Sequence, residues 1–201
     1  MKYAILILVF LAGSKIIAQK PLNSKHMLRG YFYAVTSIKD EKAIGGFAEF
    51  GKKAEPVQNT GLSSSVFLKI DTSKTVTIKG ITGYPVYLIN MTDSILRLRA
   101  SDSRLSIIAE AYINRKWQSI EYLPDSWCGN SYHSVLLKPK EQFVFEAPRY
   151  TGNSPCKLRY KLLMADGSVL YSNEIASRIN KTQLSLKEGH TPSGVMDPYN
   201  D

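Results

Sequence analysis

The amino-acid sequence predicts an exported all-β protein, an immunoglobulin-like antiparallel β-sandwich of about seven strands with an N-terminal β-hairpin extension. Three observations support this prediction. The chain begins with a short apolar run, many later segments alternate between apolar and polar residues, and turn-forming residues separate those segments. Because no segment is typical of a long amphipathic helix, two packed antiparallel sheets are the favoured architecture.

The N-terminus has the features of a signal peptide. Lys2 supplies a positive charge, and residues 4–13 (AILILVFLAG) form an apolar run of signal-peptide length. Ala18 is a small residue suited to the position before cleavage, so residues 1–18 are predicted to be removed and the mature chain to begin at Gln19. The run is about half the roughly 20 residues that span a bilayer. We therefore expect a mature chain without a transmembrane segment, located in the periplasm or outside the cell.

The positive charge of the chain favours binding to anionic partners but does not identify a particular one. The 201 residues include 26 Lys and Arg against 17 Asp and Glu, a formal charge of +9, and loss of Lys2 and Lys15 with the signal peptide lowers it to +7. Such a charge attracts acidic polysaccharides, lipid headgroups and nucleic acid non-specifically. The basic residues are dispersed, however, without a run of five or six, so no specific nucleic-acid partner is expected.

Residues 19–65 are predicted to form a strand-containing N-terminal extension. Strand-like pieces at 31–38 and 43–50 flank a charged turn, Lys39-Asp40-Glu41-Lys42. This pattern fits either an extra hairpin packed on the sandwich or a mobile arm.

Residues 66–186 are predicted to form the sandwich. Alternation marks strands at 74–79, 95–100 and 157–164, and the continuous apolar run at 84–91 (YPVYLINM) is typical of a strand buried on both sides. Turn residues between apolar runs predict hairpins at 105–112/117–123, 134–138/141–147 and 157–164/168–174. Residues 103–114 also match a helical face, but the next apolar run follows after a short turn, which favours a strand. The polar, Gly- and Pro-containing residues 187–201 are expected to be a disordered tail.

The chain has two cysteines, Cys128 and Cys156. In an oxidising compartment an even pair is most simply a disulfide, which would stabilise the fold by about 3–4 kcal/mol. The pattern differs from the Cys…Trp…Cys framework of immunoglobulin domains, since Trp127 immediately precedes the first cysteine.

The segment around Cys128 is the candidate binding site. It contains Trp127, Asn130, Tyr132 and His133. These side chains would suit a binding loop at one end of the sandwich, with aromatic faces stacking on a sugar or a protein. The alternative is a structural loop in which the disulfide anchors the chain and the aromatic rings cover the edge of the core.

Catalytic and metal-binding motifs give no support for an enzyme. Cys128 and His133 lack the third residue and the local signature of a cysteine hydrolase. They also lack the additional His and Met of a copper site. Phosphate-binding, dinucleotide-binding and zinc spacings are missing from the sequence. We expect no catalytic residue, no metal and no cofactor; the alternative is a small exported hydrolase with an unrecognised active site.

Four short segments within residues 84–184 are distinctive: Tyr84–Thr92, Cys128–Tyr132, Leu158–Lys161 and Tyr171–Asn180. In these segments the chain resembles a group of uncharacterised exported bacterial proteins with an immunoglobulin-like β-sandwich. The resemblance implies a hairpin-rich sandwich and no known activity. The sequence therefore predicts an interaction or structural module of the periplasm or cell surface, with a protein or glycan of the cell envelope as its partner.

Overall fold

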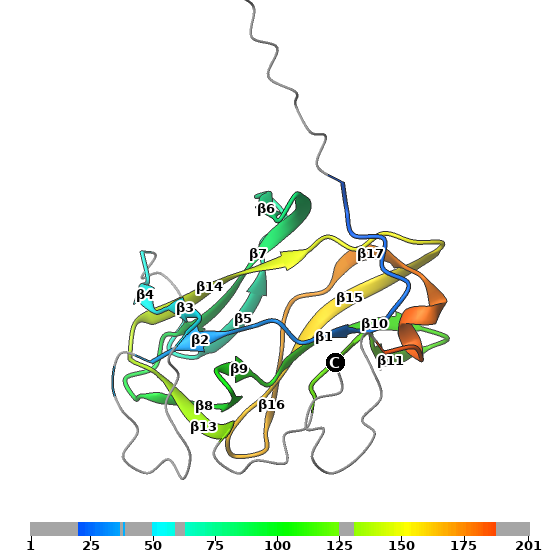
Figure 1. Ribbon diagram of the computed structural model, residues 1–201. Helices are drawn as coiled ribbons and strands as arrows, with labels where there is room; N and C mark the ends of the chain where they lie inside the picture. Colours follow the sequence, from blue (N-terminus) through cyan, green and yellow to red (C-terminus); the bar gives the residue numbers. More distant parts are fainter. Residues whose placement is uncertain (1–19, 37, 39–49, 59–62, 125–130, 188–201) are drawn as a thin grey trace, which may run out of the picture.

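The computed structural model describes residues 20–36, 38, 50–58, 63–124 and 131–187 (Figure 1). The predicted signal peptide, the residues Trp127, Cys128 and Asn130, and the predicted tail from residue 188 onward lie outside the described residues. Within the described residues no helix has the length and apolar character needed to cross a bilayer.

The described chain is all-β, as predicted. Its described residues form two five-stranded sheets, a three-stranded one and two of two strands, more than the two packed sheets expected. In sheet I the order is β4-β14-β7-β5, with β6 also paired to β7. In sheet II the order is β11-β10-β15-β16, with β17 also paired to β15, and in sheet III it is β13-β8-β9. The strands of sheet I are β4 (Glu55–Pro56), β5 (Val66–Ile70), β6 (Val76–Ile78), β7 (Ile81–Asn90) and β14 (Glu141–Pro148). Those of sheet II are β10 (Ile107–Ile113), β11 (Lys116–Ser119), β15 (Ser154–Leu163), β16 (Val169–Tyr171) and β17 (Ile175–Ile179). Sheet III contains β8 (Leu96–Ser101), β9 (Arg104–Leu105) and β13 (Tyr132–Leu137), and a 3-10 turn, η2, spans Lys181–Leu184.

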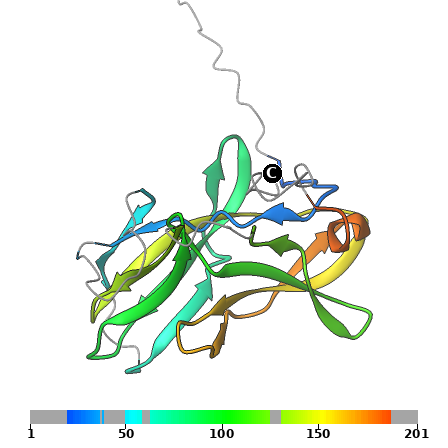
Figure 2. The same cartoon turned by 60° about the horizontal axis from the view of Figure 1, so that its bottom comes forward.

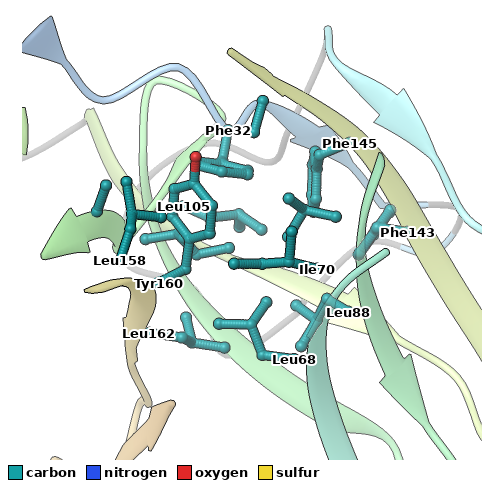
Figure 3. Close-up of a cluster of buried hydrophobic side chains, with 14 of the residues drawn as sticks. Phe32, Leu68, Ile70, Leu88, Leu105, Phe143, Phe145, Leu158, Tyr160 and Leu162 are labelled. Carbon is teal, nitrogen blue, oxygen red and sulfur yellow. The ribbon is translucent and has the colours of Figure 1, made fainter. Parts of the chain in front are cut away.

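The main core lies between the inward faces of these sheets (Figure 3). Alternation determines which residues face it, because successive side chains of a strand point to opposite sides. Leu158, Tyr160 and Leu162 of β15 are each at most 2% exposed, as their period-two pattern predicts. Aromatic rings join the layers edge to face: the Phe32 ring centroid lies 5.2 Å from that of Phe145 and 5.1 Å from that of Tyr160.

Two of the three predicted hairpins are confirmed. β10 pairs with β11, and β15 pairs with β16, both antiparallel. Residues 103–114 are strands β9 and β10 rather than a helix, also as predicted. The first of these hairpins turns on Asn114 and Arg115, both with positive φ, which is the backbone conformation of a tight two-residue hairpin turn.

The predicted hairpin 134–138/141–147 is wrong. β13 pairs with β8 of sheet III, whereas β14 pairs with β7 of sheet I. The turn Lys138-Pro139-Lys140 therefore carries the chain from one sheet to another. Asn90, which is fully buried, holds this corner: its side-chain amide donates to the backbone oxygens of Ser94, Leu137 and Lys138.

The second strand of the predicted N-terminal hairpin, 43–50, lies almost entirely outside the described residues, so that hairpin stays a prediction. The described strands on either side of it form other pairs. β2 (Ala34–Val35) pairs with β3 (Lys52–Lys53) in parallel, and β1 (Leu28–Arg29) pairs in parallel with β12 (Glu121–Tyr122). Burial holds this segment on the sandwich, since Phe32 is 0% exposed and belongs to the main core. In Figures 1 and 2 this blue segment crosses the molecule beside strands of both main sheets. Residues 20–36 thus pack on the sandwich as part of it.

Candidate functional site

An open groove of about 740 Å³ lies on the outward face of sheet I. The strand register forms its floor as two rows. Phe67, Ile89 and Gln142 lie opposite one another on β5, β7 and β14, and so do Lys69, Tyr87 and Val144. Directly opposed residues of neighbouring strands share a face, and the strands lie about 4.8 Å apart. The floor therefore presents two aromatic rings and two aliphatic side chains across three strands.

Hydrogen-bonding groups line the rim of this groove. Lys74 Nζ donates to the Tyr87 hydroxyl at 3.2 Å and lies 3.6 Å from the Asp71 carboxylate. At another part of the rim, Gln142 Nε2 donates to Glu55 Oε1 at 3.0 Å.

Two charged groups of the rim, Asp71 and Lys74, are held in their ionised forms. Hydrogen bonds from the Ser73 side chain and backbone lower the pKa of the Asp71 carboxyl. The hydrogen bond to Tyr87 raises the pKa of Lys74. Asp71 is therefore a carboxylate and Lys74 an ammonium at neutral pH. Fixed charges of this kind orient a polar ligand, whereas proton transfer needs a group that titrates near the working pH.

Two of the four predicted binding residues lie together in sheet III, at the end where β13 begins. Tyr132 and His133 begin β13, opposite Ser101 and Ala100 of β8. Tyr132 is 43% exposed, and both residues line a cleft of about 300 Å³. Trp127 and Asn130 lie outside the described residues, so their predicted membership of this site stays a prediction.

Cys156 does not have the properties of a nucleophile. It is half-buried in β15 and forms no disulfide with any described residue. Burial raises the pKa of its thiol to about 11, partly opposed by Arg178. The thiolate is the reactive form, so a thiol with this pKa is almost inert at neutral pH. Because Cys128 lies outside the described residues, the predicted Cys128–Cys156 disulfide remains a prediction.

A buried carboxyl group has a pKa in the catalytic range, but no substrate can reach it. Burial raises the pKa of Glu121 to about 7, although hydrogen bonds from Tyr150, Tyr31 and the Ala109 N–H act in the opposite direction. The Tyr150 and Tyr31 hydroxyls donate to Oε1 at 2.5 and 2.8 Å, and the Ala109 N–H donates to Oε2 at 2.9 Å. Glu121 is 0% exposed. We conclude that it joins the N-terminal segment to sheet II, since Tyr31 also contacts the Tyr160 hydroxyl at 3.1 Å.

On the outward face of sheet II, an arginine side chain already covers the faces of two aromatic rings. The Arg159 guanidinium lies 4.0 Å from the ring centroid of Trp117 and 3.7 Å from that of Tyr171. Its Nε and Nη2 atoms also donate to Glu110 at 3.0 and 2.9 Å. Both aromatic rings thus stack on an arginine whose charge is neutralised, which makes this cluster a stabilising element of the sheet.

Comparison of the chain with protein-family models, curated proteins and solved structures found no match. Among the described residues no group of three or more His, Cys, Asp and Glu side chains could hold a metal ion. The site must therefore be interpreted from its own chemistry. The groove was not predicted from the sequence, although one signal pointed to it: Phe67, Tyr87 and Ile89 occupy outward positions of their strands, where polar residues are usual.

Proposed function

We propose that this protein is an exported, non-catalytic module that binds an extended carbohydrate chain in the groove of sheet I. The observation that carries the proposal is the floor of the groove, where the Phe67 and Tyr87 rings lie among hydrogen-bonding side chains on one open sheet face. Aromatic faces pack against the C–H faces of sugar rings, and carboxylate and amide groups bond to hydroxyls. An open groove accommodates a chain that continues beyond the site.

A catalytic role has less support from the same residues. Asp71 and Lys74 are fixed in their charged forms, the Cys156 thiol is protonated, and Glu121 is out of contact with solvent. A hydrolase needs an acid, base or nucleophile that its substrate can reach.

The groove is tested with the mature chain from Gln19 onward on an array of cell-envelope polysaccharides. Tyr87→Ala should weaken binding about tenfold or more, as truncation of a central aromatic contact does, while the melting temperature changes little. Tyr112→Ala is the matched control, because Tyr112 is 40% exposed on sheet II, away from the groove. Equal losses in both variants, or binding only of protein partners, would contradict the proposal.

Export and oxidation form a second part of the proposal, supported by the sequence. Mass spectrometry of the secreted product should find Gln19 at the N-terminus, and thiol labelling of native protein should detect neither cysteine. An intact Met1 in a soluble fraction would contradict export. Two titratable thiols in protein purified without reductant would show that the disulfide does not form.

A further inference from the structure

The cleft beside Tyr132 and His133 is distinct from the groove of sheet I and has a different chemistry. It lies where β8, β9 and β13 meet the end of β15. Its walls are Arg99, Ala100, Ser101, Arg104, Ser106, Leu123, Pro124, Tyr132, His133 and Leu163. Two of these residues are arginines and none is acidic.

Arg104 is the central residue of this cleft. It is 8% exposed, and its Nε and Nη2 atoms donate to the Tyr33 hydroxyl at 3.1 and 2.7 Å. No acidic side chain in the described part of the chain pairs with it; Asp102, which is close in sequence, forms no ion pair there. The guanidinium also lies 5.2 Å from the centroid of the Tyr33 ring. A guanidinium removed from water without an anion is costly, and an anion in the cleft would offset that cost more fully than the ring does.

Two further polar groups of the cleft lack an acidic partner among the described residues. Arg99 makes no ion pair with a described residue. His133 Nδ1 lies 3.1 Å from the backbone oxygen of Ser131. Because a carbonyl oxygen only accepts, Nδ1 carries the proton of this hydrogen bond. His133 Nε2 is buried and has no hydrogen-bonding partner. Buried polar atoms are normally paired, so this atom points to a missing ligand.

The backbone fixes Arg104 beside these groups. The turn between β8 and β9 places Asp102 and Ser103 in the left-handed region, with φ of 47° and 67°. These are the angles of a tight two-residue hairpin turn, which places Arg104 opposite Ser101 at the start of β9. Tyr33 forms an antiparallel β-bridge with Arg104, and its hydroxyl accepts a hydrogen bond from the arginine side chain. The N-terminal segment therefore holds Arg104 in place.

We propose that this cleft binds a small organic anion through a carboxylate, sulfate or phosphate group. Its two guanidinium groups provide the charge-assisted donors that such oxyanions prefer, and the imidazole becomes a further donor through Nε2 when that atom takes up a proton. The volume of about 300 Å³ is larger than a bare ion needs and lies at the lower end of ligand pockets. Leu123, Pro124 and Leu163 line part of it, so the bound anion carries an apolar body.

The experiment is an NMR titration of the mature protein from Gln19 onward, which follows the Arg Nε and His ring nitrogens. Benzoate, phenyl sulfate and phenyl phosphate are the three probes, with sodium chloride at equal ionic strength as the reference. Saturable shifts at Arg104 and His133 are expected for at least one probe, and the strongest identifies the oxyanion. Arg99→Gln should weaken that binding about tenfold or more, the usual consequence of losing a charged hydrogen bond.

Arg115→Gln is the matched control, since Arg115 is an exposed arginine in the turn between β10 and β11. It should bind the probe like the unchanged protein, and so should Tyr87→Ala, which alters only the groove. Shifts that never saturate, or that sodium chloride reproduces, would overturn the proposal. So would an equal loss of affinity in Arg99→Gln and Arg115→Gln.

Discussion

Among single residues, Glu121 is completely buried and accepts three hydrogen bonds. No described basic side chain forms an ion pair with it. The three donors suit a carboxylate, yet loss of hydration raises its pKa to about 7 from a usual value of 4.5. The neighbouring hydroxyls remain donors, since burial raises the pKa of Tyr31, Tyr150 and Tyr160 well above 10. Glu121 is therefore partly protonated in the folded protein near neutral pH and almost fully ionised in the unfolded chain.

The resulting prediction concerns the pH dependence of stability. A carboxyl whose pKa is raised on folding stabilises the protein fully below about pH 4.5, and this contribution is lost as pH rises through about 7. The free energy of unfolding should fall by about 3 kcal/mol across this window, the equivalent of the pKa shift. In Glu121→Gln, which cannot ionise, this part of the pH dependence should disappear.

Urea unfolding at pH 5, 6, 7 and 8 measures both proteins. Glu146→Gln is the control, because Glu146 lies on the outside of β14 and its ion pair with Lys52 is exposed. Parallel pH curves for the unchanged protein and Glu121→Gln would contradict the assignment.

Among elements, sequence patterns predicted the strands better than their partners. Alternation identified β6, β8 and β15, because one buried face imposes period two on any half-buried strand. The hairpins β10–β11 and β15–β16 followed from their turn residues. The turn Lys138-Pro139-Lys140 has the same local chemistry but leads into another sheet. The corner is held by Asn90, 47 residues before Leu137 in sequence. A long-range side-chain contact of this kind leaves no signal in the local sequence around the turn.

Asn90 therefore gives a prediction about the corner between β13 and β14. Asn90→Ala would leave the backbone oxygens of Leu137 and Lys138 without their donor in a buried place, at a cost of about 1–3 kcal/mol for each such group. We expect the variant to be destabilised by a few kcal/mol in urea unfolding. Asn173→Ala is a matched control, since that amide binds the backbone of Ile70 at the edge strand β5 and leaves the corner intact.

Amide hydrogen exchange distinguishes the two variants. Asn90→Ala should lose protection in β13 and the start of β14, whereas Asn173→Ala should lose it in β5. Loss of protection in the same strands for both would show that Asn90 has no specific role at the corner.

The candidate sites were only partly predictable for a similar reason. Tyr132 and His133 attracted attention because aromatic and imidazole side chains were clustered in sequence. Arg104 was not singled out, since its burial and its lack of an acidic partner are visible only in three dimensions. The groove is composed of alternate residues from three strands, brought together by register alone.

For the whole molecule, the described residues from Lys20 to Thr36 are part of the sandwich. Phe32 lies in the main core, Leu22 N–H donates to Arg149 O, and Leu105 N–H donates to Phe32 O. A chain that lacks residues 19–36 should therefore fail to fold cooperatively, because removing a buried phenylalanine alone costs about 3–5 kcal/mol. Circular dichroism during thermal unfolding would show a broad, weak transition.

The milder variant Phe32→Ala keeps this prediction testable where the shortened chain aggregates. It should lower the melting temperature strongly, while Phe50→Ala should not, since Phe50 is 56% exposed. A shortened chain that melts as sharply as the mature protein would show instead that the sandwich begins after residue 36.

The long separation between the residues that meet at Glu121 affects the order in which the protein can fold. Tyr31 lies 90 residues before Glu121 and 129 before Tyr160, yet the three side chains form one hydrogen-bonded group. Synthesis produces the N-terminal end first. The side chains of Tyr31 and Phe32 therefore stay exposed until the strands that bury them have been synthesised. Contacts this distant in sequence make folding slow, on the order of milliseconds to seconds. During that interval the nascent chain exposes apolar strand residues, and a holding chaperone would protect it best by covering its first strands until β15 is complete.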